Sequence, residues 1–248
     1  MANVSLGDRS SHSPRASRWL AAIRLHPFVY LALALVALAG IGYGVSVAIE
    51  DYHDRIALRG LDGQALPVRL IVAGEPVVVP ANMLRSRKAR RGGAVDKVDF
   101  LLHWPTLEGF SEERAADFRD TAPDAPLIFI TVSARENSLD SDARLDSIYE
   151  RFFEGPELAG PAGLAGRALD AESGYGGEVV YYGPPGVKPF VARCIAADTP
   201  DIPATCIRDV NIGQGLSMLY RFNQKYLADW RTMDDRLRRL FGRFFRTP

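Results

Sequence analysis

The stretch PFVYLALALVALAGIGYGVSVAI, residues 27–49, contains 23 consecutive residues without a formal charge. As an α-helix it would be roughly 34 Å long, enough to cross a hydrocarbon core of about 30 Å with a modest tilt. The segment is apolar around its whole circumference, whereas a core helix usually keeps a polar stripe. We therefore expect residues 27–49 to form a single transmembrane helix near the N-terminus of the chain.

A cleaved signal peptide is the alternative interpretation of this segment. Ser46, Val47 and Ala48 have the small-x-small pattern of a signal-peptidase site. The apolar core of a signal peptide usually has about 7 to 15 residues, however, and this segment is longer. The length therefore favours a retained anchor.

The charges that flank the apolar segment predict its orientation. Arginines predominate before the segment and acids predominate just after it; the residues are Arg9, Arg15, Arg18 and Arg24 against Asp8, and Glu50, Asp51 and Asp54 against Arg55. Positive charges are retained on the cytoplasmic side of a membrane. We expect a cytoplasmic basic head (residues 1–26), the transmembrane helix (27–49), a juxtamembrane linker (50–64) and one external domain (65–248).

The composition of the chain favours the bacterial inner membrane, with the external domain in the periplasm. The one N-glycosylation pattern begins at Asn3, in the head, so the external part has none. Arginine outnumbers lysine by 26 to 4, which is typical of a GC-rich bacterial genome.

Both cysteines, Cys194 and Cys206, fall in the external part, where an oxidising compartment permits a disulfide. Strand-like residues 190–194 and 205–209 flank a Pro-rich loop, and a hairpin there would bring the two sulfurs together. Such a bridge would contribute roughly 3 kcal/mol by the loop-entropy argument. Two free buried thiols are the alternative, and the absence of a nearby histidine argues against a metal site.

Apolar patterning predicts strands throughout the external domain. The expected strands are residues 66–72, 76–79, 95–104, 126–133, 178–182, 187–195, 205–212 and 216–222. The segment 126–133 has almost no polar face, which is typical of a central strand. Because most connections are short, the sheet should be largely antiparallel.

Helical segments accompany these strands. A short helix should begin near Ser111, and a longer one should follow the N-cap oxygens of Asp140 and Asp142 and extend to Phe153. Residues 155–177, rich in Gly, Ala and Pro, indicate a loop with at most one weak turn of helix near residues 164–169. A long amphipathic helix over about 223–245 ends the chain, so the expected fold class is α+β.

The sequence contains no recognisable catalytic signature, and we predict no catalytic residue, metal or cofactor from it. His103 and Asp99 share a strand face, but their backbones would be roughly 13 Å apart, too far for a direct pair. We therefore interpret His103 as structural. Asp140 and Asp142 begin like a calcium loop, but Arg144 occupies the third ligand position, so helix capping explains the two aspartates better.

Residues 106–160 carry 13 acids against 5 arginines. Most of these acids fall on predicted helix surfaces, so solvated acidic faces are the simpler interpretation. A carboxylate pair gathered from loops is the alternative, and it would indicate a membrane-anchored periplasmic hydrolase acting on glycan or peptide.

Two basic clusters are candidates for binding an anionic partner. The first lies in an exposed loop and comprises Arg85, Arg87, Lys88, Arg90 and Arg91. The second lies on the C-terminal helix, where i,i+4 pairs of Asp234 with Arg238 and of Asp235 with Arg239 on a solvated face are the simpler interpretation. Docking to a partner or a membrane is the alternative. An external location argues against nucleic acid and favours anionic lipid, acidic glycan or an acidic protein.

Within the apolar segment, Gly40 and Gly44 have the spacing that permits two helices to approach closely in lipid, which indicates self-association through the span. The sequence as a whole favours a non-catalytic assembly or scaffold protein whose periplasmic domain binds another membrane or periplasmic protein, or an envelope component. A deep pocket with converging titratable groups would favour the hydrolase, and an exposed apolar or charged patch would favour binding.

Overall fold

The computed structural model describes residues 27–57, 61–119, 125–135, 139–184, 189–195 and 204–245. The chain forms two compact units, Met1–Tyr52 and His53–Pro248. The expected head (1–26) and the loop between the cysteines (196–203) lie outside the described residues.

The described part of the first unit lies in helix α1, Pro27–Ala57. The segment Val29–Ser46 has a mean hydropathy of 1.9 and fully solvent-facing side chains. By length and composition, this helix is suited either to cross a membrane or to act as a signal sequence. The helix continues past Ile49, so residues 50–57 of the expected linker are helical.

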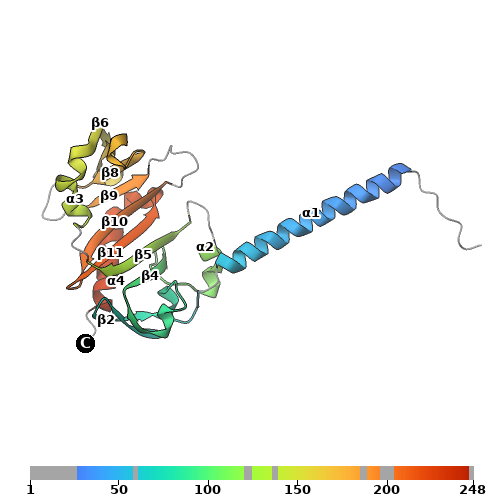
Figure 1. Ribbon diagram of the computed structural model, residues 1–248, viewed down its shortest axis with the longest axis horizontal. Coiled ribbons are helices and arrows are strands. Elements are labelled where there is room, and N and C mark those ends of the chain that lie inside the picture. Colours follow the sequence, from blue (N-terminus) through green and yellow to red (C-terminus); the bar gives the residue numbers. More distant parts are fainter. Residues whose placement is uncertain are drawn as a thin grey trace, which may run out of the picture. The chain divides into compact units, whose positions relative to one another are not determined.

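Eight strands of the second unit form one sheet in the order β4-β5-β11-β10-β9-β8-β7-β6 (Figure 1). The strands are β4 (Lys97–His103), β5 (Leu127–Ala134), β6 (Phe153–Ala159), β7 (Ala165–Leu169), β8 (Glu178–Tyr182), β9 (Val191–Ile195), β10 (Thr205–Ile212) and β11 (Leu216–Asn223). Every neighbouring pair is antiparallel. This large sheet confirms the expected antiparallel α+β arrangement.

A smaller sheet contains β1 (Pro67–Val72), β2 (Glu75–Pro80) and β3 (Gly93–Val95), in the order β2-β1-β3. β1 and β2 form the expected hairpin around Ala73 and Gly74, and β3 pairs parallel to β1. Gly74 has a φ of 91°, a backbone conformation that glycine adopts without strain.

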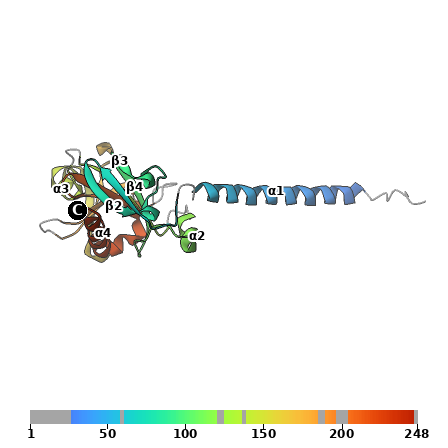
Figure 2. The same ribbon diagram turned by 90° about the horizontal axis from the view of Figure 1, so that it is seen from below.

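The main core lies between one face of the large sheet, the small sheet and the C-terminal helix. That helix, α4 (Trp230–Phe244), follows a 3-10 segment at Gln224–Asp229 and packs next to β2 (Figure 2). Leu237 and Phe241 of α4 are completely buried, and the Phe241 ring meets Phe100 edge to face at 5.0 Å. Each such side chain contributes about 1.5–3 kcal/mol of burial free energy.

Among the described residues, two helices cover parts of the opposite face of the large sheet. At one end α2 (Ala115–Arg119) places Phe118 against Leu101 and Leu127. At the other end α3 (Ser141–Ser147) places Leu145 in a cluster with Val180. The outward face of β5 and β11 between these clusters is left open, and this open face positions the site described below.

The sequence-based prediction was wrong for two neighbouring segments. The helix expected to reach Phe153 ends at Ser147, and a 3-10 turn at Tyr149–Phe152 leads directly into β6. Residues 155–177, expected to be a loop, contain most of β6 and all of β7. β6 is an edge strand with a register shift between Glu154 and Leu158, and an edge strand tolerates the glycine and proline that argued against it.

The expected disulfide is present. Cys194 of β9 and Cys206 of β10 lie directly opposite each other in the sheet, with their Cα atoms 3.9 Å apart, and both side chains are completely buried. The bridge therefore fastens two adjacent strands inside the core.

Candidate functional site

An open depression of about 1370 Å³ lies on the uncovered face of the large sheet, and we call it the sheet-face groove. The β1–β2 turn, residues 86–89, β3 and the start of β4 form its walls, and outward side chains of β5 and β11 form its floor. The alternation of the strands explains this floor: Leu216 and Met218 of β11 are buried, whereas Ser217 and Leu219 point outward.

The groove contains two large exposed apolar side chains. Ile71 of β1 is 47% exposed and Leu219 of β11 is 42% exposed. They come from different sheets but line the same groove. Apolar side chains that gather in a polar-rimmed depression are typical of a protein-binding surface.

The basic cluster predicted from the sequence reaches the sheet-face groove at Lys88. Lys88 lines the groove, and Arg85 and Arg87 are exposed on the same segment. The guanidinium of Arg85 lies 5.4 Å from the ring centre of Phe129, and that of Arg221 lies 4.9 Å from the same ring. The cluster therefore extends onto β11 through Arg221, which the sequence analysis did not include.

The remaining members of the cluster differ in exposure. Arg91 is exposed, whereas Arg90 is half-buried and donates a hydrogen bond of 2.7 Å to the Leu84 carbonyl. Burial lowers the pKa of Arg90, while Asp62 opposes that change. The hydrogen bond of Arg90 thus stabilises the conformation of the loop between β2 and β3.

Three aspartates line the groove: Asp99 and Asp209 accept hydrogen bonds from the domain, whereas Asp96 is exposed. Arg144 donates two hydrogen bonds, of 2.6 and 2.9 Å, to the carboxylate of Asp209. Ser141 donates a further hydrogen bond of 2.7 Å to the same carboxylate. Thr131 donates a bond of 2.7 Å to Asp99. Asp209 is thus held in a bidentate ion pair, whereas Asp99 accepts from a neutral hydroxyl.

Arg208 of β10 is buried on the core face of the large sheet, the face opposite the sheet-face groove. Arg208 is 1% exposed and reaches Asp142 of α3 at 2.5 Å and Asp234 of α4 at 3.1 Å. It also donates to the Val191 carbonyl at 2.8 Å and lies 4.7 Å from the ring centre of Phe190. One guanidinium thus joins both helices to the sheet. Asp140 is the N-cap of α3, as expected, but Asp142 serves this ion pair.

The protonation of this network follows from burial and charge. Burial raises the pKa of Asp142, and Arg208 offsets only part of that rise. Burial also acts to raise the pKa of Asp234, but Arg208 and Arg238 together bring it below its usual value. Burial raises the pKa of Tyr220, whose hydroxyl donates to Asp234 at 2.8 Å.

His103 has local partners that agree with a structural role. Its Nδ1 lies 2.8 Å from a guanidinium nitrogen of Arg114 and 3.1 Å from the hydroxyl of Thr106, and its Nε2 lies 3.5 Å from Asp117. Burial, and next Arg114, lower the pKa of His103. Because an arginine donates to Nδ1, this neutral imidazole connects β4 to the segment around α2.

Among the described residues, no three His, Cys, Asp or Glu side chains come together as a metal-binding group. Gly40 and Gly44 of α1 have open space around them, so a second helix could approach there. Self-association through these glycines stays a prediction.

The sequence analysis missed the apolar centre of the groove. A signal for Ile71 was present, because Arg69 and Ile71 alternate with buried Val68 and Leu70 in β1 and so point outward. For Leu219 the same alternation applies in β11. Nothing in the sequence indicated that these two outward positions meet.

No protein-family model matches this chain, and no curated protein matches it in sequence. Two solved structures are similar to it. Smlt3025, an immunity protein of the Stenotrophomonas maltophilia type IV secretion system, superposes with a TM-score of 0.51 at 16% identity, over 73% of this chain and 94% of that one. FrpD, an iron-regulated outer membrane lipoprotein of Neisseria meningitidis, has a TM-score of 0.47 at 14% identity, over 76% of this chain and 96% of that one.

The likeness to Smlt3025 shows a shared fold. At this level of identity it assigns no activity and no site, and the lower TM-score of FrpD carries no argument.

Proposed function

We propose that this chain is a single-pass protein of the bacterial inner membrane whose periplasmic domain binds a protein partner through the sheet-face groove and performs no chemistry of its own. The observation that carries this proposal is that Ile71 and Leu219, both substantially exposed, line one open groove. An exposed apolar centre with a polar rim is the usual anatomy of a protein-binding surface.

The rim of the groove specifies the chemistry of the partner. Lys88 lines the groove, and Arg85 and Arg221 are exposed on the same loop and on β11. Of the lining aspartates, Asp99 and Asp209 are already bound to donors within the domain and Asp96 is exposed. The cations are therefore available, and the partner should present one or two apolar side chains surrounded by carboxylates.

The similarity of this fold to that of Smlt3025 is consistent with a binding role. A domain of this fold serves in another bacterium as an immunity protein. Of the three aspartates among the described lining residues, Asp99 and Asp209 already accept hydrogen bonds within the domain and only Asp96 is exposed, so we favour binding over the alternative of a hydrolase.

Site-specific photo-crosslinking in intact cells tests the groove. A photoreactive amino acid replaces Leu219 in the full-length chain, and a matched control carries it at Leu158, an apolar residue of similar exposure (41%) on β6. We expect one discrete adduct from position 219 only, and we expect Ile71→Asp to abolish it. An equal adduct from position 158, or an adduct that persists with Ile71→Asp, would exclude the groove as the docking surface.

The membrane anchor requires its own experiment. Alkaline phosphatase fused after Pro248 should be active, and the mature chain should retain residues 1–49 by mass spectrometry of the membrane fraction. An inactive fusion would refute the orientation. A mature N-terminus just after Ala48 would instead show that the apolar segment is a cleaved signal peptide.

A further inference from the structure

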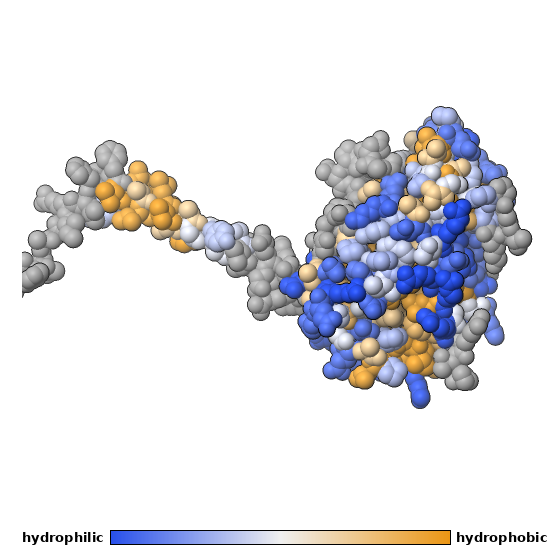
Figure 3. Space-filling model, turned by 180° about the vertical axis from the view of Figure 1, so that it is seen from behind, coloured by the Kyte–Doolittle hydropathy of each residue, from blue (hydrophilic) through white to orange (hydrophobic). Residues whose placement is uncertain are grey.

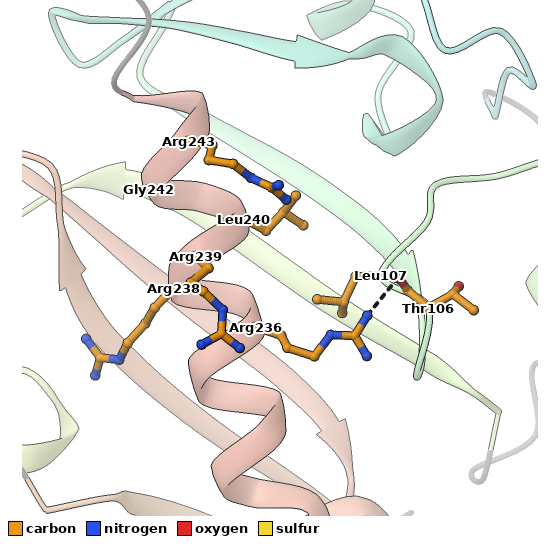
Figure 4. A pocket seen from close by; sticks show the side chains of 8 residues that line it. All are labelled: Thr106, Leu107, Arg236, Arg238, Arg239, Leu240, Gly242 and Arg243. Carbon is orange, nitrogen blue, oxygen red and sulfur yellow. Dashed lines mark hydrogen bonds between the residues drawn. The ribbon is translucent and has the colours of Figure 1, made fainter.

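A second groove, of about 740 Å³, runs along α4 beside the turn at Thr106 and Leu107, and we call it the α4 groove (Figure 4). Four arginines line it together with Leu107, Leu240 and Gly242, and none of the described lining residues is acidic. The groove is distinct from the sheet-face groove, because α4 packs on the core face of the large sheet.

Three of the arginines belong to one stripe of the helix. Arg236, Arg239 and Arg243 recur at steps of three and four residues, which places them on one side of α4. Figure 4 shows Arg236 extending toward Thr106, whose carbonyl accepts a bond of 3.3 Å from it, while Arg238 extends to the other side. Arg238 is engaged with Asp234 at 2.8 Å.

The expected pairing on this helix is thus present for Asp234 and Arg238. The second expected pair, Asp235 with Arg239, is absent from the ion pairs of the described residues, and Arg239 and Arg243 are exposed. On the side of the domain that carries α4, strongly hydrophilic side chains gather beside a small apolar area (Figure 3). This surface therefore carries positive charge that the domain itself does not neutralise.

We propose that the α4 groove binds the phosphate-bearing headgroups of anionic phospholipids. Guanidinium groups bind phosphate oxygens through paired N–H donors, and three such groups lie along two turns of one helix. The apolar residues of α4 are committed to the core, so this contact is electrostatic and needs no insertion into the bilayer.

The length of the chain favours lipid over other anions. Only residues 58–66 separate α1 from β1, and nine extended residues span about 30 Å at most. A domain tethered so closely to a span meets the bilayer surface at high effective concentration. The inference therefore rests on the proposed anchoring by α1.

A fluorophore in the α4 groove provides the test. Gly242→Cys is suitable because a Cβ atom there would meet nothing within 4 Å, and the two native cysteines are bonded to each other. The labelled full-length chain is placed in nanodiscs of phosphatidylcholine, with or without phosphatidylglycerol, each containing a trace of lipid with a spin-labelled headgroup. We expect quenching that requires phosphatidylglycerol and decreases with salt.

The variants define the outcome. One basic residue near an anionic surface raises the binding constant about fivefold. The triple variant R236Q/R239Q/R243Q should therefore lower the equilibrium constant for docking on the disc surface on the order of 100-fold. R239K/R243K should retain docking, and R69Q/R151Q/K225Q, which removes three exposed basic residues that line neither groove, should leave it unchanged.

Three results would overturn the inference. Quenching that is equal with and without phosphatidylglycerol, or equal in the two triple variants, excludes headgroup binding by this stripe. A dye response in neutral discs to an added Glu-rich peptide, without any response to phosphatidylglycerol, assigns the α4 groove to an acidic protein. A chain that fails to remain in the discs refutes the anchoring itself.

Discussion

Replacing Arg208 by methionine should destabilise the folded domain more than replacing any exposed arginine. Arg208→Met keeps most of the volume but removes the bonds to Asp142, Asp234 and the Val191 carbonyl. Asp234 would retain Arg238 and Tyr220, whereas Asp142, 9% exposed, would lose its ion-pair partner. Removing one member of a buried ion pair costs about 3–5 kcal/mol, because an uncompensated charge is left behind.

The assay is urea unfolding of the full-length chain in detergent, followed by the fluorescence of Trp104 and Trp230, which both lie in the folded domain. For a domain of this size, 3–5 kcal/mol also lowers the melting temperature by about 6–20 °C. Arg238→Met is the matched control. It removes an i,i+4 pair that is 31% exposed at the arginine and should cost about 1 kcal/mol or less.

A double variant separates the buried charge from simple loss of packing. Asp142→Asn in the Arg208→Met background removes the unpaired carboxylate and should restore at least about 1 kcal/mol. If Arg208→Met costs no more than Arg238→Met, or if Asp142→Asn restores nothing, the conclusion that the buried ion pairs of Arg208 hold α3 and α4 on the sheet is refuted.

The other predictions concern the disulfide and His103. C194A/C206A should lower the free energy of unfolding by about 3 kcal/mol because the open chain gains entropy in the unfolded state, and equal stability of the variant and of the oxidised native chain would contradict this. Since the pKa of His103 is lowered in the folded domain, the unfolded chain binds its proton first as the pH falls through about 6.5. Stability should therefore decline from pH 7 toward pH 5, and His103→Gln should flatten that decline; an unchanged slope would show that His103 does not cause it.

The sequence predicted the strands of the fold where apolar patterning and connection lengths agreed. β5 lies inside the large sheet, as its almost continuous apolar run indicated, and β1 and β2 form the expected hairpin. β6 and β7 could not be predicted, because an edge strand is stabilised by its neighbour and not by its own composition. Tyr149 and Phe152 have helical spacing, but they lie in a 3-10 turn, and their side chains pack in the hydrophobic cluster that contains Leu145 and Val180.

The sequence predicted the basic loop residues of the candidate site but not its apolar residues. The loop cations are clustered in the sequence, so the exposure of Arg85, Arg87, Lys88 and Arg91 followed from composition, whereas the half-burial of Arg90 did not. Ile71 and Leu219 are far apart in the chain, and only the packing of the two sheets brings them into one groove. The contacts of Arg208 likewise join residues separated by 66 and 26 positions, which no local pattern indicates.

The affinity of the full-length chain for the partner captured at position 219 tests the central claim most directly. Truncation of a central apolar anchor usually costs about 2 kcal/mol or more, so Ile71→Asp should weaken binding at least about 30-fold. Leu158→Asp, on the exposed edge strand, should leave the affinity unchanged. If Ile71→Asp binds as tightly as the native chain, the sheet-face groove is not the partner-binding surface.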